Sequence, residues 1–139
     1  MTEPLAAVLA PDQSYAATVT RVIDGDTLDA DVTLGSLELA GLAIMLVLQE
    51  LRIRLRGCNA AEIRTEGGKA AKAHLAELLP VGAPITLTRV TPYKYGIEVV
   101  AAIQTRTSVD LIADLIADQW VAPWDGTGTR PVPPWPRTV

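Results

Sequence analysis

The chain crowds four carboxylates into the short stretch "VIDGDTLDADV" at residues 22–32, and these are Asp24, Asp26, Asp29 and Asp31. Like charges this close together repel one another unless a cation lies near them. A hard divalent ion such as calcium, which takes several oxygen ligands, is one cation that fits. Arginine is another, and "LRIRLR" at residues 51–56 supplies three arginines at alternate positions. The sequence therefore predicts either a cation site or a set of ion pairs at this place.

The elements that carry these residues have the alternating pattern of β-strands. Residues 17–35 are rich in Val, Thr and Ile, and Asp24-Gly25 interrupts them, which predicts two strands joined by a tight turn. Asp also favours turns by bonding its own backbone, so a purely local role for Asp24 is an alternative. For Asp29 and Asp31 we expect a solvated strand face. In residues 51–56 the buried face is predicted to be Leu51, Ile53 and Leu55, and the other face Arg52, Arg54 and Arg56.

The rest of the chain alternates between helix and strand. The spacing of Ala71, Leu75, Leu78 and Leu79 predicts an amphipathic helix that Pro80 ends. "PITLTRV" and "IEVVAAIQT" predict two strands of a hairpin around "TPYKYG", and Ser108 is expected to cap a second helix in "VDLIADLIADQW". This order predicts an α+β, mainly β fold: a five-stranded barrel with two packed helices.

Size and charge narrow the class of protein. A chain of 139 residues fits one domain, for which we expect an N-terminal arm at 1–14, a folded domain at 15–122 and a tail at 123–139. Cys58 is the single cysteine, which excludes an intrachain disulfide and favours a small buried side chain. The net charge of -4 disfavours broad electrostatic binding of nucleic acid. A secretory signal and a membrane span are not expected, which favours the cytoplasm or a viral or macromolecular assembly.

Several motifs together resemble the staphylococcal-nuclease-like (thermonuclease) family. They are "ATVTRVIDGDTL", "IRLRGCNAAEIR", "TPYKYG" and "DLIADLIADQW", in the order and approximate spacing of that family. The resemblance covers about residues 15–125. It implies an OB-fold barrel and, in active members, calcium-dependent cleavage of phosphodiester bonds in DNA and RNA. Compact domains of this kind occur in bacteria and their phages, and the Phe-free, Ala-rich composition is consistent with such a source.

The resemblance assigns roles to five positions. Asp26 is similar to the first metal ligand, with Asp24 in the same turn, Arg54 to a phosphate-binding arginine and Glu62 to the general base. Asn59 stands where the family has a second metal carboxylate. Calcium wants several oxygen donors, a bound metal polarises a phosphoryl oxygen, and a guanidinium matches phosphate charge, which explains these residue types.

Two positions depart from the family pattern. Asn59 keeps an oxygen but loses a charge, so we expect calcium to bind weakly or not at all. Ile97 occupies the position of a second arginine, and loss of one such donor costs on the order of 3 to 4 kcal/mol, or about 10²–10³ in rate. Arg56 and Arg64 are possible substitutes. The resemblance with these departures predicts impaired or lost catalysis.

Two segments are more apolar than a solvated loop or tail. The stretch "ELAGLAIMLVLQE" predicts an extended hydrophobic hairpin, whose expected contacts with a protein partner or a second copy are Leu42, Ile44, Leu46 and Leu48. The tail "APWDGTGTRPVPPWPRTV" is predicted to be extended, with Trp124 and Trp135 as further contacts. His74 stands without a second histidine and is expected at the surface.

Three functions follow from these expectations. The favoured one is a nuclease-like domain that has lost efficient catalysis and serves as a structural or protein-binding module in an assembly. The alternative is a calcium-dependent phosphodiesterase in which Asn59 and water complete the ion's coordination. A non-catalytic nucleic-acid binder is disfavoured by the acidic pI of about 4.9 and by the scarcity of aromatic residues for base stacking.

Overall fold

The computed structural model describes residues 9–93 and 98–138, and this part is mainly β-sheet with two helices. The elements in chain order are β1 (Tyr15–Asp24), β2 (Thr27–Leu39), β3 (Leu42–Leu55), β4 (Cys58–Asn59), α1 (Glu66–Leu78), β5 (Pro84–Tyr93), β6 (Glu98–Gln104), α2 (Leu111–Ala117) and β7 (Ala122–Pro123). The predicted strands and both predicted helices are confirmed. The loop between β5 and β6, including Ile97, lies outside the described residues.

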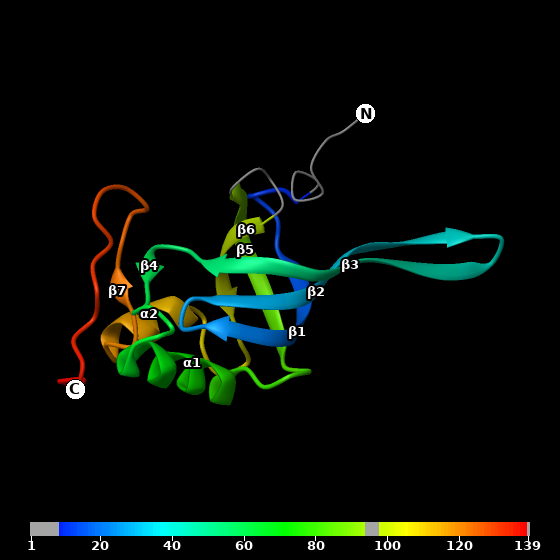
Figure 1. Ribbon diagram of the computed structural model, residues 1–139. Helices are drawn as coiled ribbons and strands as arrows, with labels where there is room; N and C mark the ends of the chain where they lie inside the picture. The colour runs from blue at the N-terminus through cyan, green and yellow to red at the C-terminus, as the bar shows by residue number, and fades with distance from the viewer. Residues whose placement is uncertain (1–8, 94–97, 139) are drawn as a thin grey trace.

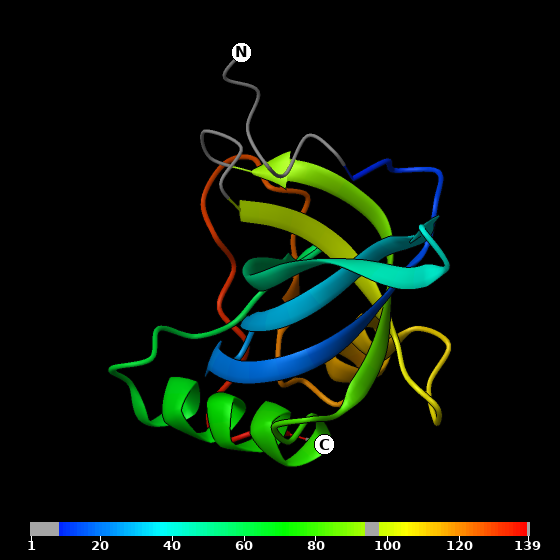
Figure 2. The same ribbon diagram turned by 90° about the vertical axis from the view of Figure 1, so that its right-hand side faces the viewer.

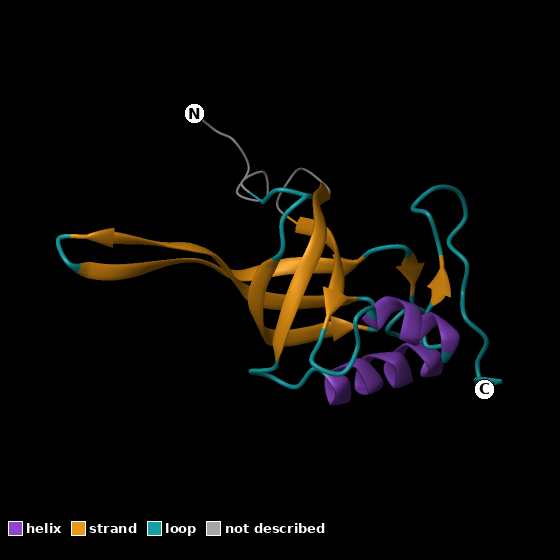
Figure 3. Cartoon of the chain, turned by 180° about the vertical axis from the view of Figure 1, so that it is seen from behind, coloured by secondary structure: helices purple, strands orange, loops and turns teal. Residues whose placement is uncertain are grey.

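Five strands form one sheet in the order β1-β2-β3-β6-β5, and pairing of β1 with β5 closes this sheet on itself (Figure 2). Neighbouring strands are antiparallel except β3 and β6, which are parallel. Both helices lie at the same end of the closed sheet, beside the short strands β4 and β7 (Figure 3). The turn between β1 and β2, which holds the acidic cluster, faces this end (Figure 1).

Alternate side chains of the strands fill the interior of the sheet. Leu28, Ile53 and Leu87 have no exposed surface, as the two-residue period of a strand with one buried face requires. In β3 the predicted inward residues are buried and the arginines between them are half-buried, so the predicted alternation is confirmed. The burial of each large aliphatic side chain contributes about 1.5–3 kcal/mol, which compensates for the absence of Phe.

Helix α1 covers the turn between β1 and β2. Its N-cap is Thr65, whose hydroxyl accepts a hydrogen bond from the Gly68 N–H at 3.0 Å. Ala71 and Leu75 are buried as predicted, whereas Leu78 is 45% exposed and its predicted burial is wrong. Leu79, the C-cap residue, is buried as predicted, although the chain leaves the helical path there, ahead of Pro80.

The predicted cap of the second helix is also wrong. Asp110 caps α2, since its carboxylate accepts a hydrogen bond from the Ala113 N–H at 3.0 Å. The Ser108 hydroxyl instead donates to the Asp114 carboxylate within the helix. A cap must lie directly before the first helical residue, and Ser108 is two residues too early for that position.

Strands β2 and β3 continue well beyond their other partners. β1 pairs with β2 only as far as Val32, and β6 pairs with β3 only from Arg52, so residues 33–47 form a hairpin that pairs with itself alone. We call this segment the arm; it projects far from the closed sheet (Figure 1). It turns at Ala40 and Gly41, both with positive φ, as a two-residue hairpin turn requires.

Asp31 shapes the base of the arm. Its carboxylate accepts a hydrogen bond at 2.8 Å from the N–H of Glu50, a residue with φ of 51° at an irregularity in the β2–β3 pairing. Such a bulge bends a strand pair and increases its twist. Asp31 therefore stabilises the point at which the arm leaves the sheet. No helix in the described ranges is long and apolar enough to cross a membrane.

Candidate functional site

A cavity of about 540 Å³ lies beside the turn between β1 and β2. It brings together residues from this turn, from β3, from the loop between β4 and α1, and from the C-terminal tail. The lining residues are Asp24, Asp26, Arg54, Asn59, Ala60, Ala61, Glu62, Ile63, Arg64, Thr129, Arg130 and Val132. All five catalytic or metal-binding positions predicted from the sequence are among them.

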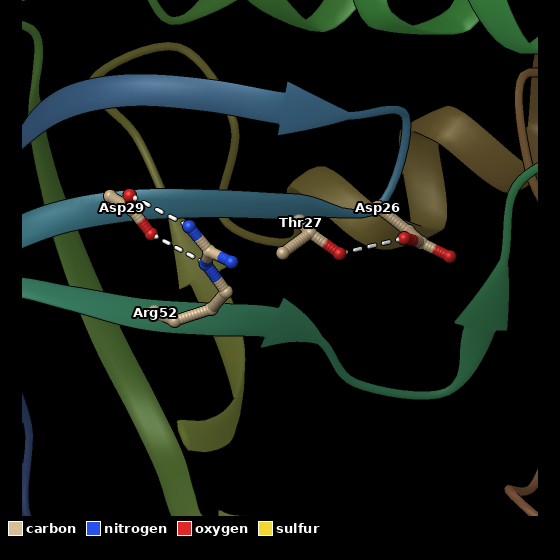
Figure 4. Close-up of polar contacts among 4 residues, drawn as sticks. All are labelled: Asp26, Thr27, Asp29 and Arg52. Carbon is tan, nitrogen blue, oxygen red and sulfur yellow. Dashed lines mark hydrogen bonds and ion pairs between the residues drawn. The ribbon is translucent and has the colours of Figure 1, made fainter. Parts of the chain in front are cut away.

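Asp26 is the most firmly held acid of the cavity, with 5% of its surface exposed. One carboxylate oxygen accepts a hydrogen bond from the Thr27 hydroxyl at 2.9 Å (Figure 4), and the other accepts from the Ala60 N–H at 2.9 Å. Its own carbonyl accepts from the Leu55 N–H at 2.8 Å. These bonds fix the carboxylate between the β1–β2 turn and the loop that leads to α1.

Asp24 lies directly beside Asp26. Its carboxylate accepts a hydrogen bond from the Asp26 N–H at 3.0 Å, the local turn contact that favours Asp at this position. Burial, and after it the neighbouring Asp26 carboxylate, raises the pKa of Asp24 to about 6. The raised pKa means that two crowded, partly desolvated carboxylates share this turn. A divalent cation would relieve their repulsion.

Arg54 reaches the same cavity from β3. Its guanidinium lies 5.0 Å from the centroid of the Tyr93 ring, a cation–π arrangement that orients the side chain. Arg56 has a different role, because it donates to the carbonyls of Arg89 and Val100 and to the Thr91 hydroxyl. It lines a second cavity of about 440 Å³ rather than the first, so the suggestion that Arg56 substitutes for the arginine expected at position 97 is wrong.

Glu62 and Arg64 lie on the exposed rim of the cavity. They form an ion pair in which the Glu62 side chain is 68% exposed and that of Arg64 82% exposed. The Glu62 carbonyl accepts from the Thr65 N–H and hydroxyl, which ties this loop to the N-terminus of α1. Exposed pairs of this kind contribute little to stability and separate readily, so both side chains are free to move toward a ligand.

Asn59 is buried, with 5% of its surface exposed, and it does not direct its amide nitrogen at the carboxylates. Its side-chain N–H donates to the Pro131 carbonyl of the tail at 2.9 Å. A carboxylate cannot make this bond, since it has no donor. Asn59, which the sequence resemblance places among the metal ligands, thus fastens the C-terminal tail.

Asp29 lies outside the cavity, and the expectation that it lines a solvated strand face is wrong. It is 8% exposed and accepts two hydrogen bonds from the Arg52 guanidinium, at 2.9 and 3.2 Å (Figure 4). The two residues are paired across β2 and β3 in the sheet register, which a local pattern does not reveal. The acidic cluster therefore divides into a neutralised member, Asp29, an arm-shaping member, Asp31, and the two acids of the cavity.

The acids that could hold a metal are Asp24 and Asp26. Throughout residues 9–93 and 98–138, no three His, Cys, Asp or Glu side chains are grouped as a metal site. The oxygens of Asp24 and Asp26 are of the kind that a hard cation takes, and water and a phosphate oxygen would have to supply the remaining positions. Cys58 does not line the cavity: it is buried, its thiol donates to the Leu55 carbonyl, and burial raises the pKa of that thiol.

None of the predicted contact residues lines the cavity. Leu42 and Leu46 of the arm are 67% and 45% exposed, Ile44 is half-buried, and Leu48 is half-buried against the core. Trp124 is half-buried beside β4, and Trp135, 49% exposed, lies on Gly67 of α1. The tail thus rests on its own domain. His74 is half-buried and stacks on Trp120, with ring centroids 4.2 Å apart.

Sequence reasoning missed the tail residues of the cavity, Thr129, Arg130 and Val132. They belong to no recognisable motif, and only the path of the tail brings them to the acids. Comparison of the chain with protein-family models and with curated protein sequences gives no match.

Proposed function

We propose that this chain is a nuclease-like domain of OB-fold type whose cavity binds a phosphodiester together with a divalent cation and cleaves it slowly. The observation that carries this proposal is the convergence of Asp24, Asp26, Arg54 and Glu62 on one cavity from three separate segments of the chain. Crowded acids next to arginines are suited to a cation and a phosphate. An acid cluster alone would bind only the cation, and an arginine alone would bind only the phosphate.

Each side chain has a part in such a reaction. Asp24 and Asp26 would hold the cation, which when bound would polarise a phosphoryl oxygen and orient water. Arg54, oriented on Tyr93, would bind the non-bridging oxygens of the phosphate with its planar guanidinium. Glu62, once separated from Arg64, would accept the proton of the attacking water at a carboxylate oxygen.

Slow cleavage follows from the two departures. The Asn59 amide is engaged with the tail and adds no negative charge, so the cation is held by two carboxylates. Ile97 stands where the resemblance expects an arginine that stabilises the transition state. Loss of one such donor lowers the rate of cleavage by about 10²–10³. We therefore expect the chain to bind a phosphodiester but to hydrolyse it slowly.

Binding of a fluorescein-labelled single-stranded DNA, followed by fluorescence anisotropy in calcium and in EDTA, tests this function. Wild-type protein should bind more tightly in calcium, and both Asp26→Asn and Asp24→Asn should remove that difference. Asp12→Asn, which removes an exposed acid outside the cavity, is the matched control. Cleavage in calcium should be slow, yet faster than that of Glu62→Gln, which lacks the proton acceptor. Equal binding in calcium and EDTA would refute the proposal.

A second function, self-association through the arm, is favoured by one independent observation. Pairing across the arm places Leu37 opposite Ile44, Leu39 opposite Leu42 and Gly35 opposite Leu46, so that one face is a continuous apolar stripe. Leu39 and Leu42 are 62% and 67% exposed. An isolated two-stranded hairpin is only marginally stable in water, so this arm needs a surface that covers it.

The occupant we propose for the stripe is a second copy of this chain. A two-fold axis places the same apolar face on both sides of a contact, so the stripe is complementary to itself. The charged residues nearest the stripe are acidic, Glu38 in the arm and Glu50 at its base, which disfavours an anionic membrane surface or nucleic acid. The open backbone edges of the arm are also available to a second strand pair.

Sedimentation equilibrium over a range of concentrations measures this self-association. Leu39→Glu and Leu42→Glu should each produce a monomer, because a charge in the apolar contact loses its hydration. Val109→Glu is the matched control, since Val109 is an isolated apolar residue that is 86% exposed elsewhere on the surface. A wild-type chain that stays monomeric at high concentration would overturn this second function.

A further inference from the structure

The C-terminal tail is fastened at its start. β7 pairs with β4, so that Ala122 lies opposite Asn59, and the Trp124 N–H donates to the Gly57 carbonyl at 2.9 Å. The Trp124 indole N–H turns back to the Thr127 carbonyl at 2.8 Å. The first residues of the tail are therefore held against the segment that leads into the cavity loop.

The tail is fastened again near its end. The Thr138 N–H donates to the Gln119 side chain at 3.0 Å, and the Arg137 guanidinium lies 3.8 Å from the centroid of the Trp120 ring. Trp135 lies so close to α1 that a methyl group at Gly67 would approach its Cβ to 3.2 Å. The tail thus runs along the outside of β4 and the helices, from one fastening to the other (Figures 1 and 3).

The middle of the tail forms a wall of the cavity. Thr129, Arg130 and Val132 line it, and the bond from Asn59 to the Pro131 carbonyl holds the backbone between them. The Arg130 guanidinium lies 5.2 Å from the centroid of the Trp124 ring. Among the residues that the structure describes, Arg130 has no carboxylate within ion-pair distance.

From this geometry we propose that Arg130 is a second phosphate-binding residue of the cavity and that Asn59 is its positioning residue. The proposal rests on the proposed phosphodiester function and adds a residue that comes from outside the closed sheet. A guanidinium without an acidic partner, which lies over an aromatic ring and lines the same cavity as Arg54, is suited to bind phosphate oxygens with paired N–H donors. A phosphodiester chain with two adjacent phosphates would engage Arg54 and Arg130 together.

The salt dependence of binding separates a phosphate contact from a structural effect. Each phosphate contact on a single strand contributes about 0.7 to the slope of log K against log salt concentration. For fluorescein-labelled single-stranded DNA in calcium, Arg130→Ala should lower affinity about tenfold and reduce that slope by about 0.7. Arg130→Lys should keep most of the slope, because it keeps the charge.

Two further variants control for charge and for positioning. Arg106→Ala removes an exposed arginine that lines a different surface hollow, so it should leave the slope unchanged. Asn59→Ala removes the bond to Pro131 without changing any charge, and it should lower the slope as Arg130→Ala does. Combining Asn59→Ala with Arg130→Ala should cause no further decrease in slope, because both changes remove the same contact.

The outcomes distinguish this inference from the function on which it rests. If wild-type protein binds in calcium and Asp24→Asn abolishes that binding, but Arg130→Ala behaves like Arg106→Ala, Arg130 is not a phosphate ligand and the cavity function stands. If wild-type protein shows no calcium-dependent binding, both are overturned. Circular dichroism spectra of Arg130→Ala and Arg130→Lys should match the wild type, since Arg130 is exposed.

Discussion

Asp24 should lower the stability of the folded chain at neutral pH, and Asp24→Asn should raise it. The Asp24 carboxylate is partly buried beside Asp26, and its pKa is raised to about 6 by burial and by that neighbour. Asn has the same shape, and its side-chain oxygen can still accept the hydrogen bond from the Asp26 N–H. The substitution therefore removes the charge and keeps the turn.

The magnitude follows from linkage between protonation and folding. Because the folded pKa, about 6, is above the ordinary value of 3.8, the folded state favours the protonated carboxyl. Its contribution to stability is complete below pH 3.8 and is lost as the pH rises through 6. A shift of this size corresponds to about 3 kcal/mol in full. Solvent reaches part of the side chain, so screening reduces the expected gain of Asp24→Asn to about 1–2 kcal/mol at pH 7.

Urea denaturation at pH 7 and at pH 4 measures the effect. The free energy of unfolding of Asp24→Asn should exceed that of the wild type at pH 7, and the difference should shrink greatly at pH 4, where the wild-type carboxyl is mostly neutral. Asp12→Asn should change neither value, because Asp12 is exposed and has no acidic neighbour in the sequence. Destabilisation by Asp24→Asn at pH 7, or an equal gain at both pH values, would refute the reasoning.

Calcium should reduce the repulsion between the carboxylates of Asp24 and Asp26. A cation bound by Asp24 and Asp26 stabilises the folded state by mass action, so calcium should raise the melting temperature of the wild type more than that of Asp24→Asn. Protons compete with the cation for Asp24, so the stabilisation by calcium should fade as the pH falls through about 6.

The remaining predictions concern residues that position the site. Arg52→Ala leaves the buried Asp29 carboxylate without its partner and should cost about 2 kcal/mol in urea denaturation, whereas Arg106→Ala should cost little. Gly25→Ala places a methyl group 2.7 Å from the Ala71 Cβ, so it should cost about 1–3 kcal/mol and weaken calcium-dependent DNA binding by displacing the turn. A Gly25→Ala variant as stable as the wild type would show that α1 does not set the position of the turn.

The sequence predicted those parts of the fold that depend on local pattern. Leu51, Ile53 and Leu55 alternate with arginines, and a period of two places them inside whatever their partners are. The turn at Asp24-Gly25 also depends on local sequence alone, since the preference of Asp and Gly for turns needs no distant partner. The cap of α2 was missed because Ser108 and Asp110 are both good cap residues, and only the backbone path decides between them.

The parts that could not be predicted depend on contacts between distant residues. An ion pair between this cluster and the arginines was one of the two alternatives predicted, but the sheet register decides that it joins Asp29 to Arg52. Asp31 meets Glu50 because of a bulge, so four similar aspartates have three different environments. The tail contains many prolines and no periodic pattern, and nothing local indicates that it folds back onto β4 and α1. The position of Arg130 at the cavity could therefore not be predicted from the sequence.

Asn59 links the cavity loop to the C-terminal tail. The resemblance alone indicates only that the amide of Asn59 lacks the negative charge of a carboxylate metal ligand. In the structure the same amide is a donor, and its N–H holds the tail that carries Arg130 to the cavity. Compared with the carboxylate that the resemblance leads one to expect, Asn59 carries one negative charge fewer and helps to position one cation. Both changes make the cavity more positive, which favours holding a phosphodiester chain by its phosphates over holding a metal tightly for hydrolysis.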